Sequence, residues 1–475
     1  MTRLRLTSLT LLAVTCLCLG CTPKLPDPTA SIEPEGRFTS SGEVALDEQW
    51  WTLFNDPVLN RLVEQGHSEN LTIKSAWDRL DQAGAVARQA GSSLLPSLDA
   101  NAAFTSTRTK TSGITSDSDL YSLGLAAGYE LDLWGRVRGA NKAADLELLA
   151  TGEDLKSALL TVTAEVATTW LQLVEQYGQK RIINEQIAIN GKTLELVELQ
   201  FRTGKVGIAD LLQQRQLVER NRGELTRVEV TISLLEHALA ILLGKEPGEA
   251  GELEPASFHK LPPLPETGLK IELLERRPDI QSAWYAVRAA NQRTRSAIAD
   301  RFPKVTLGAR ASTSSTNSSG LFDDWATSLS ANLLGPIIDG GNRRAEVDRR
   351  RAITSEALNR YRLTVLEAIT EVEDALVREL RQADYLASLE AQLELSTAAT
   401  ERIRDRYTKG SENYQRVLDS ILSEQSLQRS ILTARRQLYE YRIALYRSLA
   451  GGWQPQRPAP TVNTKTKTDN LSRVQ

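Results

Sequence analysis

A very long helical pattern at residues 136–203, which no proline interrupts, most constrains what this sequence can fold into. Within it, apolar residues from Leu155 to Tyr177 recur at steps of 4, 3, 4, 4, 3 and 4, and the stripe then continues with one polar break at Asn190. This spacing is typical of a coiled-coil face. At about 1.5 Å per residue such a helix would span on the order of 100 Å, more than a single compact domain can accommodate. The pattern therefore predicts a rod or a tube.

The sequence also repeats itself. Phe201-Arg-Thr-Gly204 returns as Tyr407-Thr-Lys-Gly410, 206 residues later. Upstream, Ser75-Ala76-Trp77 returns as Ser282-Ala283-Trp284, 207 residues later, so one residue differs in a connecting loop. A nearly constant offset predicts two copies of one unit. The copies are rich in Leu, Ala, Arg, Glu and Gln, which favour helix, so the fold class is expected to be mainly α.

Each copy has the same predicted order of elements. A first helix is expected at 57–92 and again at 269–301, and a very long helix, a glycine-containing turn and a last helix end each copy. Two stretches of alternating small, β-tolerant and aromatic residues lie between the first and the long helix; they are residues 97–110, 120–134, 303–315 and 325–338. The polar segments between them, 111–113 with Asp117 and Asp119, and 317–320, are expected to be hairpin loops.

The alternating stretches are long enough for tilted membrane strands, which need about 9–11 residues. Four strands cannot close a barrel, and open edges are not tolerated in lipid, so several chains would have to share one barrel. The alternative is that they form two ordinary soluble hairpins. Beyond the N-terminus, no segment approaches about 18 uninterrupted apolar residues, so any membrane crossing is predicted to be by β-strands.

The N-terminus has the form of an export signal. Arg3 and Arg5 precede an apolar stretch at 9–19, which ends in Cys18-Leu19-Gly20-Cys21. This resembles a bacterial lipoprotein signal with lipidation at Cys21, although leucine stands one place later than usual; a plain secretory signal is the alternative. All three cysteines lie in this segment and the three histidines are scattered, so neither a disulfide nor a metal site is expected in the mature chain.

Several motifs together resemble the TolC-type family of outer-membrane efflux proteins, in its OprM/NodT branch. They are Asp56-Pro-Val-Leu-Asn60, Tyr129-Glu-Leu-Asp-Leu-Trp-Gly-Arg136, Leu273-Leu-Glu-Arg-Arg-Pro-Asp-Ile280, Phe302-Pro303 and Pro336-Ile-Ile-Asp-Gly-Gly341. The resemblance implies a homotrimer in which four strands per chain form a twelve-strand barrel and the long helices form a periplasmic tunnel. It also implies an adaptor (membrane fusion) protein and an inner-membrane pump of the RND type as partners, and outer-membrane lipid around the barrel.

The sequence divides accordingly. We expect a signal peptide at 1–20, a tether at 21–49, a first repeat at 50–246, a Pro-rich linker at 247–268, a second repeat at 269–453 and a disordered tail at 454–475. No cofactor is expected apart from a covalent lipid on Cys21. The near balance of 57 basic and 60 acidic residues argues against a nucleic-acid partner.

The resemblance places the functional residues at the periplasmic tip. The turns carrying Gly204, Lys205, Gly207, Gly410 and Ser411 are candidate contacts for the adaptor. Asp419 falls on the family's aspartate ring, whose negative charges would attract cations and repel anions. The remaining gate candidates are its neighbours Gln415, Arg416 and Leu422, with Asp210 in the first repeat.

This sequence departs from related channels at two positions near Asp419. Related channels often carry an apolar residue at position 415 and an arginine at position 422, so a locking Asp–Arg pair is either absent here or rebuilt with Arg416. Asp419 is alternatively a solvated helix-surface residue.

The whole chain is alternatively a structural periplasmic coiled-coil lipoprotein without channel activity. An enzyme is not expected, because the sequence has no G-x-S-x-G, HExxH or P-loop motif.

Overall fold

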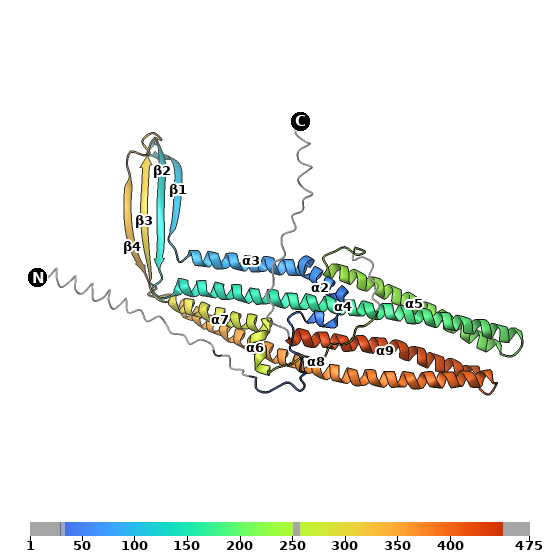
Figure 1. The fold of residues 1–475 in the computed structure, drawn as a ribbon. Helices are drawn as coiled ribbons and strands as arrows, with labels where there is room; N and C mark the ends of the chain where they lie inside the picture. Colours follow the sequence, from blue (N-terminus) through green and yellow to red (C-terminus); the bar gives the residue numbers. More distant parts are fainter. Residues whose placement is uncertain (1–28, 30–33, 250–256, 450–475) are drawn as a thin grey trace. The chain divides into compact units, whose positions relative to one another are not determined.

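The computed structural model describes residue 29 and residues 34–249 and 257–449 (Figure 1). Cys21, the signal and the tail lie outside the described residues. The described helices and strands follow the predicted order in both repeats; they are η1 (Trp50–Phe54), α2 (Pro57–Glu69), α3 (Leu71–Ser92), β1 (Ser97–Thr111), β2 (Ile114–Leu131), α4 (Arg136–Arg202), α5 (Ile208–Leu242), η2 (Lys270–Glu272), α6 (Leu273–Arg276), α7 (Pro278–Ala299), β3 (Lys304–Ser315), β4 (Ala326–Leu334), α8 (Asn342–Thr408) and α9 (Tyr414–Leu449).

The chain forms two compact units, and each unit draws on both sequence repeats. Among the described residues, unit 1 contains Asp78–Glu153 and Asp279–Thr364, and unit 2 contains Pro34–Trp77, Asp154–Pro278 and the chain from Val365. The compact units therefore do not coincide with the repeats. The ranges expected for the repeats and the linker stay predictions about sequence organisation.

The two long helices are confirmed. α4 and α8 contain 67 residues each. In unit 2 the apolar stripe of α4 is buried, including Leu159, Val166 and Leu173. An 18-residue window of α4 is apolar enough to cross a membrane by length and composition, but 61% of that window is buried inside the protein, as in the core helix of a soluble protein.

The first helix of each repeat is not continuous, which corrects the prediction of one helix at 57–92 and one at 269–301. In the first repeat the helix breaks at Asn70, whose side chain accepts from the Thr72 and Ile73 N–H groups and donates to the Leu242 carbonyl at 2.8 Å. An asparagine with these bonds caps a new helix, α3. The distant carbonyl fixes the break at this position.

The corresponding break in the second repeat is at Arg277, before Pro278. Residues that precede proline avoid the helical region, and proline is favoured as the first residue of a helix. Arg277 is accordingly extended, and its guanidinium donates to Glu371 at 2.9 Å and to the Ser448 carbonyl at 3.2 Å. The two breaks lie 207 residues apart, which is the offset of the repeat in this region.

Unit 2 has an aromatic core around η1. Trp50 stacks on Tyr446 of α9 with ring centroids 5.5 Å apart, and Phe54 meets Tyr446 edge-on. The described part of the linker also packs here, because the buried Arg442 forms an ion pair with Glu379 and donates to the carbonyls of Pro262 and Pro263. A buried cation with both charged and carbonyl partners fixes the linker against α9.

The four strands of unit 1 form one antiparallel sheet in the order β1-β2-β3-β4 (Figure 1). The β1–β2 ladder runs to the pair Thr111↔Ile114, with a turn of only Ser112 and Gly113, both at positive φ. This is the type I′ geometry that suits a two-residue hairpin. The predicted loop at 111–119 is therefore too long: Asp117 and Asp119 belong to β2. At the other edge, β4 ends at Leu334 rather than 338, because Pro336 has no N–H to donate.

Candidate functional site

The first helical tip lies between α4 and α5. Gly204 has φ 71°, its N–H donates to the Phe201 carbonyl, and the Lys205 N–H reaches back to the Gln200 carbonyl at 2.8 Å. These bonds close a helix C-terminus around a left-handed residue, which glycine adopts without strain. Asp210 lies in the first turn of α5 and accepts from the Gly207 N–H at 3.2 Å. In this chain Asp210 therefore caps a helix.

The second tip, between α8 and α9, repeats this geometry. Gly410 has φ 78° and donates to the Tyr407 carbonyl, and the Ser411 N–H reaches the Arg406 carbonyl at 3.0 Å. Asn413 caps α9 by accepting from the Arg416 N–H at 3.0 Å. The tip residues predicted to contact an adaptor thus lie in two matching turns, as the sequence repeat predicts.

Asp419 and Arg416 do not pair with each other. Asp419 is exposed and accepts from the Gln415 side chain at 3.0 Å, one helical turn earlier. The exposed Arg416 instead forms an ion pair with Glu412 at 3.3 Å. Within the residues that the structure describes, Asp419 forms no ion pair, so a lock rebuilt with Arg416 is not found in this single chain. Whether Asp419 forms a gate stays a prediction.

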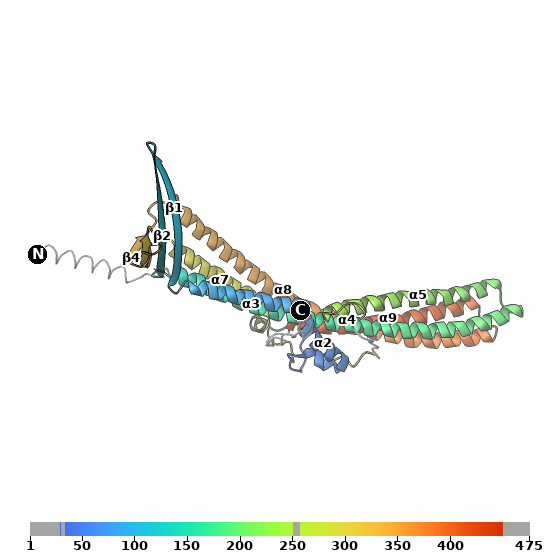
Figure 2. The same cartoon turned by 90° about the horizontal axis from the view of Figure 1, so that it is seen from above.

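Leu422 packs into an apolar cluster between the two tips. Its buried members come from α4, α5 and α9; they are Val197, Leu211, Leu217, Tyr414, Val417, Leu418 and Ile421. Figures 1 and 2 show α4 beside α5 and α8 beside α9, and this cluster joins the two hairpins. The leucine at position 422 therefore adds apolar contact at this junction, where an arginine would bring a charge.

A buried polar contact that the sequence did not predict also joins the hairpins. The Tyr414 hydroxyl donates to Gln214 Oε1, and Gln214 Nε2 donates to the Asn190 carbonyl at 2.7 Å. Gln214 and Asn190 are fully buried. Burial, followed by the charges of Tyr407 and Asp210, raises the pKa of Tyr414 well above its usual range. Tyr414 is therefore a neutral donor throughout the physiological range.

The polar contacts continue along α4 and α9. Glu175 forms a buried ion pair with Arg436 at 2.5 Å and accepts from the Thr433 hydroxyl at 2.6 Å. Nearer the tip, Gln186 accepts from Arg429 at 3.0 Å. The one polar break in the predicted stripe, Asn190, belongs to this series. The break was visible in the sequence, but its partners on α5 and α9 were not.

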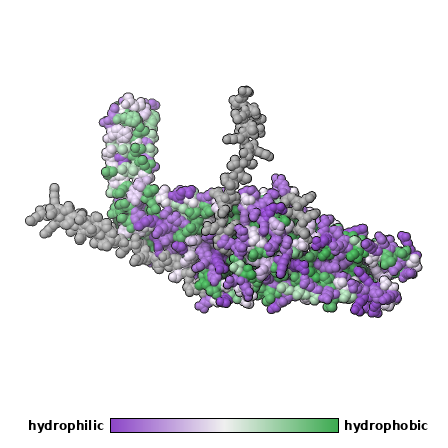
Figure 3. Space-filling view, viewed as in Figure 1, coloured by the Kyte–Doolittle hydropathy of each residue, from purple (hydrophilic) through white to green (hydrophobic). Residues whose placement is uncertain are grey.

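The sheet of unit 1 has one apolar and one polar face. The register brings Leu98, Ala127, Ala309 and Leu329 to one level of the first face. Other members of this apolar face are Ala100, Ala102, Phe104, Tyr121, Leu123, Leu125, Tyr129, Leu131, Val305, Leu307, Ala311, Ala331 and Leu333. Exposed apolar side chains run along the sheet in Figure 3, and Leu329 is 89% exposed. An extensive exposed apolar face indicates a surface that is covered in the working protein.

The apolar face has the height of a membrane. On β2 it runs from Tyr121 to Leu131, which at about 3.3 Å per residue and a tilt of about 40° spans roughly 25 Å, the height of the apolar band in membrane barrels. Tyr121 packs against Phe104 at 4.8 Å, and beyond this aromatic pair the same face carries the exposed ion pair Arg108–Asp117. An aromatic boundary followed by charge is typical of a membrane–water interface.

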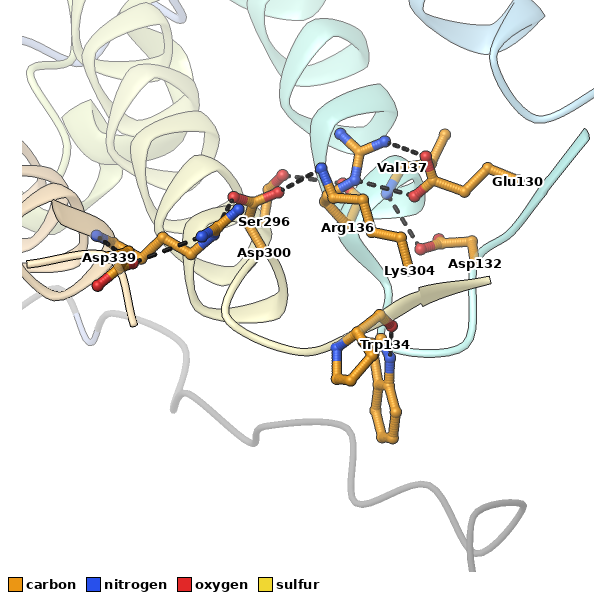
Figure 4. Close-up of polar contacts among 11 residues, drawn as sticks. Glu130, Asp132, Trp134, Arg136, Val137, Ser296, Asp300, Lys304 and Asp339 are labelled. Atoms are coloured by element: carbon orange, nitrogen blue, oxygen red, sulfur yellow. Dashed lines mark hydrogen bonds and ion pairs between the residues drawn. The ribbon is translucent and has the colours of Figure 1, made fainter. Parts of the chain in front are cut away.

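The strand-to-helix junction explains the motif at 129–136 (Figure 4). Glu130 forms two hydrogen bonds with Arg136, at 3.0 and 2.6 Å, and Asp132 accepts from the N–H groups of Val137 and Arg138 at the start of α4. Burial alone would raise the pKa of Asp132, but these N–H groups and the Arg138 guanidinium outweigh it and lower the pKa. The charged residues of the motif therefore hold the first turn of the helix.

Trp134 completes the junction. Its indole N–H donates to the Pro303 carbonyl at 2.7 Å, and its ring stacks on Phe302 at 4.9 Å. The motif residues Phe302 and Pro303 thus contact the motif of the first repeat. These contacts are those of a residue that packs at the strand-to-helix junction.

The comparison with known protein families agrees with this geometry. The family model "Outer membrane efflux protein" matches residues 62–245 and 270–451. This chain belongs to the outer membrane efflux protein family. The two matched segments confirm the internal repeat. As an efflux protein of this family the chain is an outer-membrane channel subunit, and the reading as a coiled-coil lipoprotein without channel activity is not supported.

Individual relatives match almost the whole length of this chain. The chain is 32% identical to the pyoverdine export outer membrane protein OpmQ of Pseudomonas aeruginosa, over 93% of this chain and 96% of the relative. It is 26% identical to the probable outer membrane lipoprotein SilC of Salmonella typhimurium, over 95% and 100%. The solved outer-membrane channel OprN superposes with a TM-score of 0.81 at 28% identity, over 92% and 99%. The outer-membrane localisation and the TolC-like fold predicted from the sequence are confirmed.

Proposed function

We propose that three copies of this chain form the exit duct of a tripartite efflux system, and that the duct conducts small molecules passively. The observation that carries the trimer is the four-stranded sheet. In the described chain β1 and β4 pair on one side only, and the sheet has an apolar face of membrane height. Unpaired backbone groups are too costly in lipid to stay open. Pairing β4 of one copy with β1 of the next leaves no edge in a twelve-strand barrel.

The partners follow from the same assembly. A duct without an energy source needs a pump, and we propose an inner-membrane pump of the RND type with a periplasmic adaptor that contacts the two tips. The turns at Gly204–Gly207 and Gly410–Ser411 support this, because two similar turns in each of three chains present one nearly repeated surface. OpmQ is named for pyoverdine export, which supports small organic molecules as the cargo. The protein itself is proposed to perform no chemistry and to need no cofactor beyond a lipid on Cys21.

Two lysine variants test the membrane assignment. Leu329→Lys puts a charge on the apolar face, where lysine at the bilayer midplane costs about 2–4 kcal/mol. Ser330→Lys puts the same charge on the polar face of the same strand and is the matched control. Unheated gel electrophoresis of the outer-membrane fraction should show a trimer for the wild type and for Ser330→Lys, and a much weaker trimer band for Leu329→Lys.

Conductance in planar bilayers completes the test. The wild type and Ser330→Lys should form channels. A wild type that stays monomeric and non-conducting would overturn the proposed function. Equal assembly of the two lysine variants would instead show that the apolar face does not contact lipid.

A further inference from the structure

On the polar face of the sheet, three neighbouring rows of side chains run across the strands, and the middle row carries charge. The register aligns Asp99 of β1, Ala126 of β2, Arg310 of β3 and Ser328 of β4 in a single row. The two adjoining rows on this face are uncharged; they are Ser97, Gly128, Gly308 and Ser330 on one side, and Asn101, Gly124, Ser312 and Ala326 on the other.

Arg310 is the longest side chain in these three rows. The glycines beside it are covered by short polar groups: a Cβ on Gly124 would lie 2.7 Å from Asn101 Oδ1, and one on Gly308 would lie 2.7 Å from Ser330 Oγ. Arg310 itself is exposed, and within residues 34–249 and 257–449 it forms no ion pair. The face is therefore a low polar surface from which one guanidinium projects.

The consequence of this geometry rests on the proposed trimer. With the apolar face towards lipid, the polar face lines the lumen. Strands about 4.8 Å apart and tilted by about 40° give a twelve-strand barrel a backbone radius of roughly 12 Å. An extended arginine covers roughly half of that radius, whereas the shorter Asp99 stays nearer the wall. Three copies of Arg310 then surround the axis at one height.

We propose that Arg310 is a specificity-determining residue that binds anionic groups of the cargo, carboxylate or phosphate, inside the membrane barrel. The planar guanidinium fork matches these groups with two parallel hydrogen bonds. The site is separate from the aspartates at the tip and has the opposite charge. It would retain organic anions briefly at the exit and pass neutral cargo without a contact.

Block of the channel current by a trivalent anion tests this inference. Citrate is added on the barrel side of trimers in a planar bilayer at 0.1 M KCl. Arg310→Gln should weaken the block roughly tenfold or more, since three charges are removed together. Arg310→Lys keeps the charge but lacks the guanidinium fork, so its block should be weaker than that of the wild type and stronger than that of Arg310→Gln. Asp99→Asn should leave the block equal or stronger. In 1 M KCl the wild-type block should weaken, because the screening length falls from about 10 Å to about 3 Å.

The outcomes separate this inference from the proposed function. Citrate block that is as strong in Arg310→Gln as in the wild type overturns the role of Arg310. If Arg310→Gln does not assemble, Ser328→Asp adds three carboxylates to the same row without changing Arg310; a weakened block supports the inference and an unchanged block overturns it. A wild type that forms no channel would instead refute the proposed function.

Discussion

The buried hydrogen bond from Tyr414 to Gln214 gives the sharpest prediction about opening at the tip. It joins two helices whose residues lie 200 positions apart in the sequence, and parting the two hairpins requires it to break. Tyr414→Phe keeps the ring in the apolar cluster and removes only the hydroxyl. Gln214, which is fully buried, then loses the hydrogen bond that its Oε1 accepts from residue 414.

The magnitude follows from that burial. Leaving a buried acceptor unsatisfied costs about 1–3 kcal/mol, and opening would restore its hydration. The closed arrangement should therefore be destabilised by about 1–3 kcal/mol relative to the open one. This corresponds to roughly a 5- to 150-fold shift of the closed–open equilibrium towards the open arrangement. The open probability of single channels in planar bilayers measures this shift directly.

Tyr407→Phe is the matched control. The Tyr407 hydroxyl donates to Gln200 at 3.1 Å, but Tyr407 is only partly buried, so water can replace the lost partner. Its effect should be small, at most about threefold. An open probability for Tyr414→Phe that matches the wild type, or that is smaller than that of Tyr407→Phe, would refute the reasoning.

Three further predictions concern single residues. Asp419→Ala should raise single-channel conductance or antibiotic leakage; unchanged conductance would remove Asp419 from the gate. Burial lowers the pKa of His67 from 6.5 to about 4, so its contribution to stability is present above pH 6.5 and is lost as the pH falls towards 4, by up to about 3 kcal/mol. His67→Gln should flatten this pH dependence of heat denaturation, and an unchanged slope would argue against it. Asp132→Ala removes the acceptor at the start of α4 and should cost about 0.5–2 kcal/mol of stability, measured by the same denaturation; no loss would show that water caps the helix equally well.

The extent of the elements could be predicted because their signals are local. The stripe from Leu155 to Tyr177 and the alternation along β1 each follow from the period of one element. Apart from the breaks in the first helix of each repeat, the errors were at element ends. The hairpin turn at Ser112 and Gly113 was predicted too long, because Asp117 reads as a loop residue until its partner Arg108 on the neighbouring strand is known.

The candidate site was predicted in part. The glycine turns and the position of Asp419 could be identified from the repeat and from family resemblance. Tyr414 and Gln214 could not, because a tyrosine and a glutamine on helical faces have no distinctive spacing. The only local signal was Asn190, a polar residue in an otherwise apolar stripe.

The sequence by itself determined the two repeats, the long helices and the two-faced strands, since each depends on periodicity within a short stretch of chain. Only the tertiary structure decided where the first helix of each repeat breaks. Asn70 and Arg277 are fixed by carbonyls 172 and 171 residues away, at Leu242 and Ser448. The tertiary structure likewise decided the buried contacts of Asn190 and the charged row at Arg310. Both depend on the register between elements, which no single element encodes.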